Sequence, residues 1–323
     1  MRAFVTGGAG FIGSHLVERL IREGNTVTVY DNLSTGTLQY LNSAYGCESF
    51  KFIEADLLDR NTLNSSISGH DNVFHFAANA DIRHGLENPF KDLEQNTIAT
   101  FNLLEAMRNN GLRKIVFASS AAALGEPEKF PTPETCATPI QTSLYGASKM
   151  ACEGLISSYC EGYNFEGYSY RFVSLLGPRY PHGHVFDFVK QLRNNPKKLK
   201  ILGNGMQKKS YMHINDCIDA IVISALEKKT ANITSHNYQI YHLGNTEYIL
   251  LNDSIKWICD QMQVSPKISY TGGQRGWVGD QPFVFLDVSK IMNEKWKPTH
   301  TIEESIRETA DWLNSNPWIF DTR

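Results

Sequence analysis

The chain has no excess of charge of either sign and no long apolar run. Its 31 Lys and Arg against 34 Asp and Glu leave a formal net charge of −3, so it lacks the basic surface that binds nucleic acid or an anionic membrane. No apolar stretch approaches the roughly 20 residues that span a bilayer. Met1 leads directly into a strand-like segment and not into a signal peptide. We therefore expect a soluble, cytoplasmic protein that binds neither nucleic acid nor membrane.

Cysteine and histidine patterns are equally uninformative. The six cysteines show no C-x-x-C pair and no zinc-like spacing, which predicts reduced and mostly buried thiols. Among the ten histidines, His182 and His184 are the one close pair, and they lie in a loop rich in Pro and Gly. Such loop histidines are more often polar loop groups than ligands, so no metal site is predicted.

The first half of the chain alternates short β-branched runs with helical segments, a pattern typical of a parallel sheet covered on both faces. Strands are expected at Arg2–Thr6, Thr26–Tyr30, Lys51–Ala55, Asn72–Phe76, Lys114–Ser119 and Tyr168–Phe172, and helices at Phe11–Glu23, Glu94–Asn110 and Leu144–Glu161. Gly24, Gly111 and Gly162 end these helices and suit left-handed C-caps. The predicted fold class is α/β, a Rossmann doubly wound parallel sheet with a smaller C-terminal α/β lobe.

The composition changes after about Leu176, where a loop rich in Pro, Gly and His begins. We expect residues 1–176 to form the domain of the parallel sheet, with a segment near 211–243 returning to it, and residues 177–323 to be mainly the smaller lobe. Further helices are expected near Val185–Asn194, Leu251–Met262 and Thr301–Leu313, and strands at Gln239–Leu243 and Lys267–Thr271. Asp216 is expected to be the N-cap of the helix that opens there.

Gly7, Gly10 and Gly13 stand between an expected strand and an expected helix, the context in which such glycines bind a dinucleotide. They allow a tight turn and a close approach of the backbone to a pyrophosphate. The helix that starts with Phe11 and Ile12 adds the positive potential of its N-terminus.

An acidic residue, Asp31, ends the second expected strand. A carboxylate there accepts hydrogen bonds from the ribose hydroxyls and repels a 2′-phosphate, so it predicts NAD as the cofactor. The alternative is an ordinary turn former in the run Asp31-Asn32-Leu33-Ser34. Asp56 and Leu57 end the third strand and are candidates for holding the adenine edge.

Phe76, Ala77 and Ala78 end the fourth strand, and the two small residues let a cofactor lie close to the backbone. Asn96 lies on a helix that crosses the sheet. It either contacts the cofactor or makes hydrogen bonds inside the core, and both alternatives remain open.

Tyr145 and Lys149 are four residues apart, so they share one face of an expected helix. A neighbouring ammonium lowers the pKa of a phenol, and such a phenol can take a proton from a sugar hydroxyl while a hydride leaves the same carbon. The pattern Y-x-x-x-K also occurs by chance on ordinary helices. The glycine-rich turn and the pair Ser119-Ser120 favour the catalytic interpretation.

Together these motifs resemble the extended short-chain dehydrogenase/reductase family, in particular its nucleotide-sugar epimerase branch of UDP-glucose/UDP-galactose 4-epimerase-like proteins. The resemblance rests on Thr6–Gly13, Asp31, Asp56-Leu57, His75–Ala78, Asn96, Ser119-Ser120, Tyr145 and Lys149, and on the later landmarks Gly177–Arg179, Leu202–Gln207, Gly279-Asp280 and Leu286–Pro298. It implies an NAD that is reduced and reoxidised within one turnover while the sugar passes through a 4-keto form.

In the scheme that this resemblance implies, Tyr145 takes the proton of the sugar 4-hydroxyl and Ser120 hydrogen-bonds the same oxygen. Lys149 holds the nicotinamide ribose. Asn32 and Ser119 are further cofactor contacts by resemblance.

The residues after Ser120 distinguish branches of the family. Its 4,6-dehydratases carry an Asp-Glu pair there, whereas this chain has Ala121-Ala122, which can neither donate nor accept a proton. The resemblance therefore implies epimerisation or simple oxidation and reduction. Two residues depart from the family pattern. Ser174, in place of the usual Asn, is a shorter donor to the substrate phosphate, and Val284, in place of a bulky residue, leaves room for an enlarged sugar.

The smaller lobe is expected to bind a nucleotide-diphosphate sugar. By resemblance, Lys209 occupies the place of a diphosphate-binding Arg, and Arg275 and Asp280 supply the second diphosphate and ribose contact. Ser174 and His184 complete the predicted substrate site. The alternative for Lys208-Lys209 is a solvated turn.

Three functions remain open at this point: a nucleotide-sugar 4-epimerase with tightly held NAD, a 4-ketosugar reductase with exchangeable NAD(P)H, and a non-catalytic dinucleotide-binding protein. By analogy with the family, the chain is expected to form a homodimer through its helices at Glu94–Asn110 and Leu144–Glu161. Both helices could equally be ordinary cover for the sheet.

Overall fold

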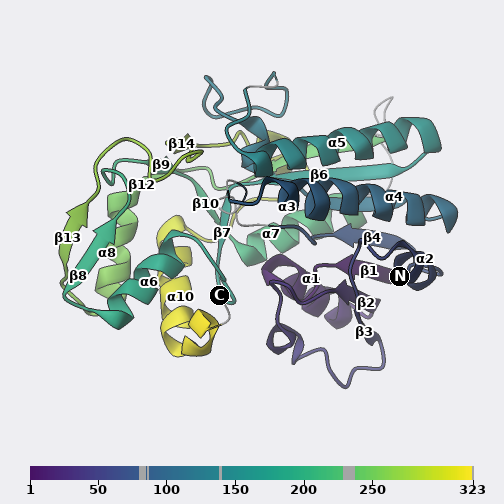
Figure 1. Cartoon of the computed structure of the whole chain (residues 1–323), viewed down its shortest axis with the longest axis horizontal. Coiled ribbons are helices and arrows are strands. Elements are labelled where there is room, and N and C mark those ends of the chain that lie inside the picture. Colours follow the sequence, from purple (N-terminus) through teal and green to yellow (C-terminus); the bar gives the residue numbers. More distant parts are fainter. Residues whose placement is uncertain (80–84, 86, 138–139, 228–236, 322–323) are drawn as a thin grey trace. The chain divides into compact units, whose positions relative to one another are not determined.

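The β-branched and aromatic runs of the first half form the seven-stranded sheet of a Rossmann fold (Figure 1). Its strands are β1 (Arg2–Thr6), β2 (Thr26–Asp31), β3 (Phe50–Glu54), β4 (Asn72–His75), β5 (Lys114–Ala118), β6 (Glu166–Phe172) and β11 (Tyr238–Leu243). They lie in the order β11-β6-β5-β4-β1-β2-β3, and the pairs among β1 to β6 are parallel. The strand order reverses between β1 and β4, the place where open α/β sheets bind ligands. The predicted fold class is confirmed.

The computed structural model describes residues 1–79, 85, 87–137, 140–227 and 237–321. By their internal contacts these residues form two units. The first comprises Met1–Gly125, Ser143–Arg171 and Ile221–Tyr241, and the second comprises Glu126–Thr142, Phe172–Ala220 and His242–Arg323. The sequence did not predict that Glu126–Thr142 belongs to the second unit. The segment that returns to the first unit begins at Ile221 and not near residue 211.

Helices pack on the sheet of the first unit. They are α1 (Phe11–Arg22), η1 (Leu38–Leu41), α2 (Arg60–Ser66), α3 (Pro89–Asp92), η3 (Leu93–Ile98), α4 (Ala99–Asn109), η4 (Ala121–Leu124) and α5 (Leu144–Tyr163). In Figure 1, α4 and α5 run side by side along the sheet. Leu103 and Met107 on α4 and Ile156 on α5 share one buried apolar cluster with Phe4 and Phe117 of the strands. This burial fixes α5, which carries Tyr145 and Lys149, against the sheet.

One of the three predicted helix ends differs from the expectation. Gly24 and Gly111 adopt the predicted left-handed conformation, with φ of 77° and 75°. The prediction for Gly162 is wrong, because α5 continues through it and Asn164 supplies the left-handed cap with φ of 56°. Asn is the residue that tolerates this conformation best after Gly, so the helix gains an extra half turn.

The single helix expected at Glu94–Asn110 is divided. The segment η3 is π-helical and is followed without a break by α4. A π-helical turn inserts an extra residue into the helix, and such turns are frequent at functional sites. Here the turn carries Asn96.

The second unit contains three small sheets and its own helices. The strands are β7 (Ser174–Leu176) paired with β10 (Tyr211–His213), β8 (Lys198–Ile201) paired with β13 (Lys267–Tyr270), and β9 (Lys208–Lys209) between β12 (Ile249–Leu250) and β14 (Phe283–Val284). The helices include α6 (His184–Asn194), α8 (Leu251–Gln261), α9 (Ser289–Met292), α10 (Ile302–Ser315) and η6 (Pro317–Asp321). The capping box at Thr301 and Glu304 is present at the start of α10. Helix α7 (Ile214–Ile221) and η5 (Val222–Glu227) lead the chain back into the first unit.

The prediction that Asp216 caps α7 is wrong. The helix begins at Ile214, so Asp216 lies in its first turn. Its buried carboxylate accepts hydrogen bonds from Thr299 Oγ1 at 2.6 Å and from the His300 amide at 3.1 Å. Asp216 therefore fastens the segment before α10 instead of capping its own helix.

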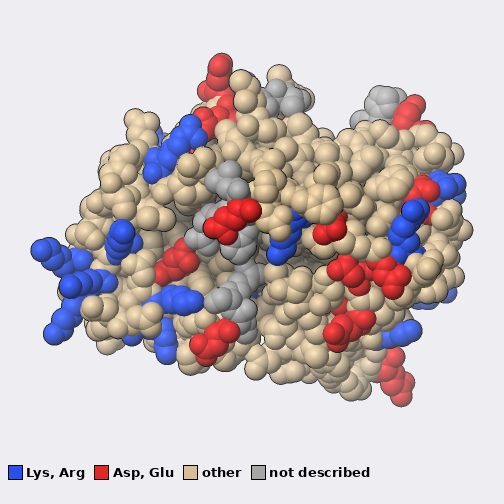
Figure 2. Space-filling model, in the orientation of Figure 1, with Lys and Arg blue, Asp and Glu red and all other residues tan. Residues whose placement is uncertain are grey.

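Charged side chains of both signs are mixed among uncharged residues on the face shown in Figure 2. This mixture agrees with the nearly balanced composition. Among the residues that the structure describes, no helix has the length and apolarity needed to cross a bilayer.

Candidate active site

The turn after β1 is shaped by its glycines. Gly7 has φ of 69°, and a Cβ there would overlap the backbone at Ala77, two residues after the end of the neighbouring strand β4. A Cβ at Gly13 would overlap the Gly7 carbonyl oxygen. Gly10 is the N-cap of α1 and offers no side chain to the first amides of that helix, which include those of Phe11 and Ile12. The turn is therefore tight, free of side chains and open at a helix N-terminus, as phosphate binding requires.

Asp31 ends β2 and lies against this turn. Its Oδ2 accepts a hydrogen bond from the Ala9 amide at 2.9 Å and its Oδ1 accepts one from the Leu33 amide at 2.9 Å. Burial raises the pKa of Asp31, and the two amides oppose that rise. The carboxylate is thus held at the glycine-rich turn, where a ribose hydroxyl would meet it.

The next two predicted positions are joined by a hydrogen bond. Asn32 donates from Nδ2 to Asp56 Oδ2 at 2.7 Å, and the other oxygen of Asp56 accepts from the Leu58 amide at 2.9 Å. Leu57 belongs to the apolar core, and its carbonyl accepts a hydrogen bond from Asn102 Nδ2 at 3.1 Å.

The end of β4 is fixed by a buried histidine. The Phe76 amide donates to the Thr6 carbonyl at 3.0 Å, which holds Phe76, Ala77 and Ala78 beside the glycine-rich turn. The His75 ring lies between Thr6 Oγ1, 2.7 Å from Nδ1, and Thr100 Oγ1, 2.9 Å from Nε2. Burial, reinforced by the charge of Lys149, lowers the pKa of His75 to about 3, so the ring is neutral.

Asn96 makes its hydrogen bonds within the protein. Its Oδ1 accepts from the Asn79 amide at 2.8 Å and its Nδ2 donates to Ser148 Oγ at 2.8 Å. Ser148 in turn donates to the Tyr145 carbonyl at 2.8 Å. Of the two alternatives left open from sequence, the structure shows the core hydrogen bonds, and these position the main chain of Tyr145.

Tyr145, Lys149 and Ser120 come together as the spacing predicts. Lys149 Nζ lies 5.7 Å from the centroid of the Tyr145 ring, and the Ser120 side chain is close enough to the Tyr145 hydroxyl to lower its pKa. Lys149 Nζ also donates to the Ala118 carbonyl at 2.9 Å. A buried phenol and a buried ammonium therefore lie beside a partly buried hydroxyl just after the end of β5.

The expected lowering of the Tyr145 pKa is wrong for the protein alone. Burial raises the pKa of Tyr145 to about 12, and the hydrogen bond from Ser120 only partly opposes this effect. Burial also lowers the pKa of Lys149 to about 8. Both shifts have one cause, the loss of water around the charged form, and sequence spacing cannot show it.

Ser119 does not lie open for a ligand. Its hydroxyl donates to Glu153 Oε1 at 2.5 Å, and Glu153 is a buried residue that the sequence motifs did not single out. Arg171 pairs with the same carboxylate, with Nη2 2.7 Å from Oε2. The signal was available, because Glu153 follows Lys149 by the same four residues that separate Lys149 from Tyr145.

In the second unit, the predicted diphosphate contacts form one cluster. Lys209 Nζ lies 2.8 Å from Asp280 Oδ1 and also donates to the Gln281 carbonyl. Arg275 donates to the Asp280 carbonyl at 3.1 Å and is paired with Glu126. The cluster thus contains two cations whose positions are set by carboxylates.

Ser174 lies on β7 and His184 at the start of α6, where the charge of Lys209 reaches the His184 ring. His184 Nε2 is 2.7 Å from Ser254 Oγ, and its ring lies 4.8 Å from that of Tyr211. Burial lowers the pKa of His184 to about 3. A neutral ring in these contacts is better suited to packing than to holding a phosphate.

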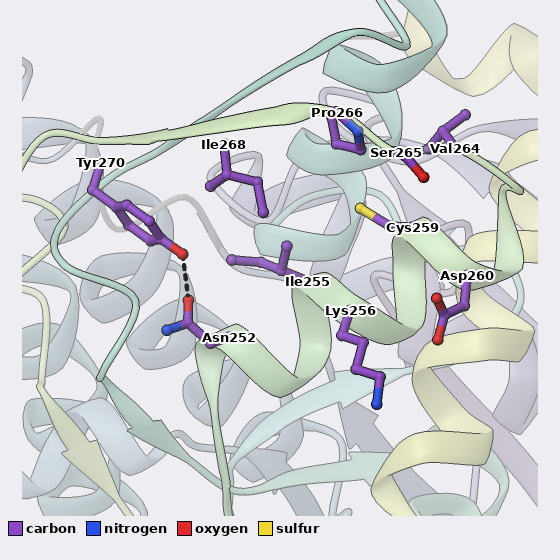
Figure 3. A pocket seen from close by; sticks show the side chains of 10 residues that line it. All are labelled: Asn252, Ile255, Lys256, Cys259, Asp260, Val264, Ser265, Pro266, Ile268 and Tyr270. Carbon is purple, nitrogen blue, oxygen red and sulfur yellow. Dashed lines mark hydrogen bonds between the residues drawn. The ribbon is translucent and has the colours of Figure 1, made fainter.

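The same unit has a hollow of about 310 Å³ between α8 and β13 (Figure 3). It is lined by Asn252, Ile255, Lys256, Cys259, Asp260, Val264, Ser265, Pro266, Ile268 and Tyr270. The Tyr270 hydroxyl closes one end by donating to Asn252 Oδ1 at 2.9 Å. None of the predicted site residues lines it, so it is separate from the candidate site.

Residues 3–241 match the family described as the NAD dependent epimerase/dehydratase family. The chain belongs to this family. It is similar to the UDP-glucuronate 4-epimerase of Thermodesulfobacterium geofontis, with 31% identity over 328 residues that cover 97% of this chain and 96% of that protein.

Solved structures of the family superpose over nearly the whole chain. A UDP-galactose 4-epimerase is 34% identical with a TM-score of 0.87, covering 98% of this chain and 100% of the other. A UDP-glucose 4-epimerase of Thermus thermophilus, solved in complex with NAD, is 30% identical with a TM-score of 0.83, covering 97% of this chain and 99% of the other. The resemblance inferred from the motifs is confirmed at the level of family and fold.

Proposed function

We propose that this protein is an NAD-dependent nucleotide-sugar 4-epimerase. The observation that carries the proposal is the grouping of Tyr145 with Ser120 and Lys149, followed by Ala121-Ala122 where an elimination would need an acid and a base. The family and its UDP-sugar 4-epimerase members, at about the same length, support it.

The first unit fits NAD. The glycine-rich turn has no room for a Cβ at Gly7 or Gly13, and it leaves the start of α1 open to a pyrophosphate. Asp31 is held where it would accept hydrogen bonds from a ribose and repel a 2′-phosphate. Asn32, Asp56 and the main chain of Leu57 would then lie along the adenine, and Phe76, Ala77 and Ala78 along the cofactor at the end of β4.

The catalytic roles follow from the chemistry of the three grouped side chains. When bound, NAD supplies reversible oxidation at C4 of the sugar and a positive charge on its nicotinamide ring. Tyr145 takes the proton of the 4-hydroxyl and later returns it, and Ser120 shares a hydrogen bond with that oxygen. Lys149 favours the phenolate of Tyr145 by its charge, against the burial that raises the tyrosine pKa to about 12.

The substrate is, we propose, a UDP-linked sugar whose diphosphate and ribose are held by Lys209, Arg275 and Asp280. Charge-assisted hydrogen bonds to a diphosphate are the contacts that such cations make best. Val284 pairs in register with Lys209 and is only half buried, so a sugar larger than glucose can be accommodated near it. The other predicted contact, Ser174, is exposed on β7.

The test is to incubate the purified protein with nucleotide sugars and no added cofactor and to follow the anomeric protons by NMR. The panel contains UDP-glucose, UDP-N-acetylglucosamine, UDP-glucuronate and a GDP-linked sugar. Approach to an equilibrium between two C4 epimers supports the proposal and names the sugar. Conversion only of a 4-keto sugar, and only with added NAD(P)H, would overturn it in favour of a reductase.

We propose further that the protein is a homodimer. Phe90, Leu93, Ile98, Phe101 and Leu144 are 37–57% exposed on α3, η3, α4 and α5, although they are large apolar residues. Burying them between two copies would remove this surface from water. Sedimentation of Phe101→Glu against the parent tests it, and an unchanged monomer in both would contradict it.

The six cysteines are all free thiols, four of them buried. Free thiols without disulfides are typical of reducing compartments, which supports a cytoplasmic location.

A further inference from the structure

Three side chains form a row along one face of α5. Tyr145, Lys149 and Glu153 are each four residues apart, and all three are buried. The first two are the proposed catalytic pair. The third, Glu153, is one turn further along the helix and is 5% exposed.

The row contacts three consecutive residues at the end of β5. The Tyr145 hydroxyl lies close enough to the Ser120 side chain for Ser120 to lower its pKa, Lys149 donates to the Ala118 carbonyl at 2.9 Å, and Glu153 accepts from the Ser119 hydroxyl at 2.5 Å. The segment that carries Ser120 is thus attached to α5 at each of its residues. Without Glu153 the middle attachment is lost.

Glu153 is itself fixed by an arginine on the neighbouring strand. Arg171 on β6 donates from Nε to Oε1 at 2.9 Å and from Nη2 to Oε2 at 2.7 Å. This bidentate pair leaves the carboxylate one orientation, in which Oε1 is shared between Arg171 and Ser119. Removing one partner of such a buried pair leaves the other charge without compensation.

We propose that Glu153 is a positioning residue of the active site, which holds Ser119 and thereby aligns Ser120 with Tyr145, and whose negative charge stabilises the ammonium of Lys149. Glu153 acts through these residues and not on the sugar. The expected effect of Glu153 on turnover rests on the proposed function. Its expected effect on the charge of Lys149 does not.

The charged and titratable groups around Lys149 come from three elements. Burial lowers the pKa of Lys149 to about 8, while Cys152, Asp92 and Glu153 raise it. Asp92 lies on α3, and the neutral His75 on β4. Glu153 faces Arg171 on β6 and Tyr238 on β11. Removing the charge of Glu153 removes one of the few groups that favour the charged lysine.

The test is Glu153→Gln with Glu105→Gln as the matched control. Glu105 has the same partners in kind: Arg108 donates to its two oxygens at 2.9 Å each, and the Tyr159 hydroxyl donates to Oε1 at 2.6 Å. It lies on α4 of the same unit, and its charge is not among the groups that shift Lys149. If both variants change the Lys149 titration and kcat to the same extent, the effect comes only from the loss of an ion pair.

The first readout needs no turnover. The titration of Lys149 is followed by NMR in protein labelled at lysine Cε, with the signal assigned by its loss in Lys149→Met. We expect the midpoint to move to lower pH in Glu153→Gln and to stay at the parental value in Glu105→Gln. An unchanged midpoint in Glu153→Gln would overturn the proposal that the charge of Glu153 stabilises the ammonium of Lys149.

The second readout is epimerase turnover. We expect kcat to fall about tenfold or more in Glu153→Gln with KM nearly unchanged, as misplacement of catalytic groups causes. Ser119→Ala should lower kcat without moving the Lys149 titration, since it leaves the carboxylate in place. Glu153→Asp should keep the titration close to the parental one.

The outcomes separate the two proposals. A parent protein that epimerises no sugar refutes the proposed function, while the lysine titration still tests Glu153. Parental kcat in both Glu153→Gln and Ser119→Ala would overturn the positioning role.

Discussion

The two units hold a buried or half-buried lysine in opposite ways. Lys149, in the first, is 3% exposed and donates to a main-chain carbonyl, so its charge is compensated only by more distant groups. Lys209, in the second, lies 2.8 Å from the carboxylate of Asp280. A lysine without a close carboxylate is sensitive to its surroundings and can influence a neighbouring phenol. A lysine with a permanent partner is held in one place and suits recognition.

The largest effect should come from removing the phenol that Lys149 faces. Tyr145→Phe deletes the group that carries the proton, so we expect kcat to fall by about a thousandfold, within the range of general acid–base catalysis. NAD released on denaturation should remain at the parental amount, because the phenylalanine preserves the ring. Tyr159→Phe is the control, since Tyr159 is similarly buried on the same helix. Retained turnover in Tyr145→Phe would contradict the assignment of the base.

Removal of the paired lysine should instead affect binding. Lys209→Ala removes a charge-assisted contact, and we expect KM for the UDP-sugar to rise roughly tenfold with kcat largely preserved. Lys208→Ala is the matched control, because Lys208 is adjacent on β9 and lies 5.4 Å from the Phe283 ring centroid. Steady-state kinetics by NMR or a coupled assay separates the two parameters. A fall in kcat with unchanged KM would contradict the assignment of Lys209 to substrate binding.

Both units should lose stability in acid to a similar extent. His75 and His184, one in each unit, have pKa values of about 3 when folded, against about 6.5 when unfolded. Below pH 6.5 the unfolded chain binds protons that the folded chain does not, so stability falls as pH falls toward 3. The expected loss is about 1.4 kcal/mol per pH unit for each histidine.

Urea unfolding between pH 7 and 5 measures this loss. His75→Gln and His184→Gln should each reduce the slope of the unfolding free energy against pH by the contribution of one proton. A midpoint that does not change with pH in the parent would show that neither ring is neutral when folded.

The smallest effect concerns the alkaline side of turnover. Lys149 has a pKa of about 8, so raising the pH through that value removes the positive charge beside Tyr145. We expect kcat to have halved near pH 8, and Lys149→Arg to shift this limb to higher pH, since Arg stays protonated. A pH profile of epimerisation measures it. A limb that stays in place in Lys149→Arg would assign the titration to another group.

Local patterns in the sequence predicted most of the fold and the grouping of the site. The glycine-rich turn, the acid at the end of β2 and the four-residue spacing of Tyr145 and Lys149 depend on neighbours in the chain, and the structure places them as expected. The capping box at Thr301 was also predictable because its residues are close together in the sequence.

Features that depend on distant partners were not predictable. Asp216 resembles a cap in the sequence, yet its partners Thr299 and His300 are more than eighty residues away. The pKa of Tyr145 is governed by burial, which no spacing reports. The four-residue spacing places Glu153 on the face of Tyr145 and Lys149, but its partners Ser119 and Arg171 are distant in the sequence and were not predictable.

The hydrogen bonds of His75 have a fixed direction. Thr100 donates its proton to the Asn96 carbonyl at 2.7 Å, so it accepts from His75 Nε2, and Nδ1 must then accept from the Thr6 hydroxyl. The chain of donors runs one way, from the first strand through the ring to the helix at Asn96. The direction of this series of hydrogen bonds is therefore set when the protein folds. Reversing it would require every hydroxyl in the series to rotate at once.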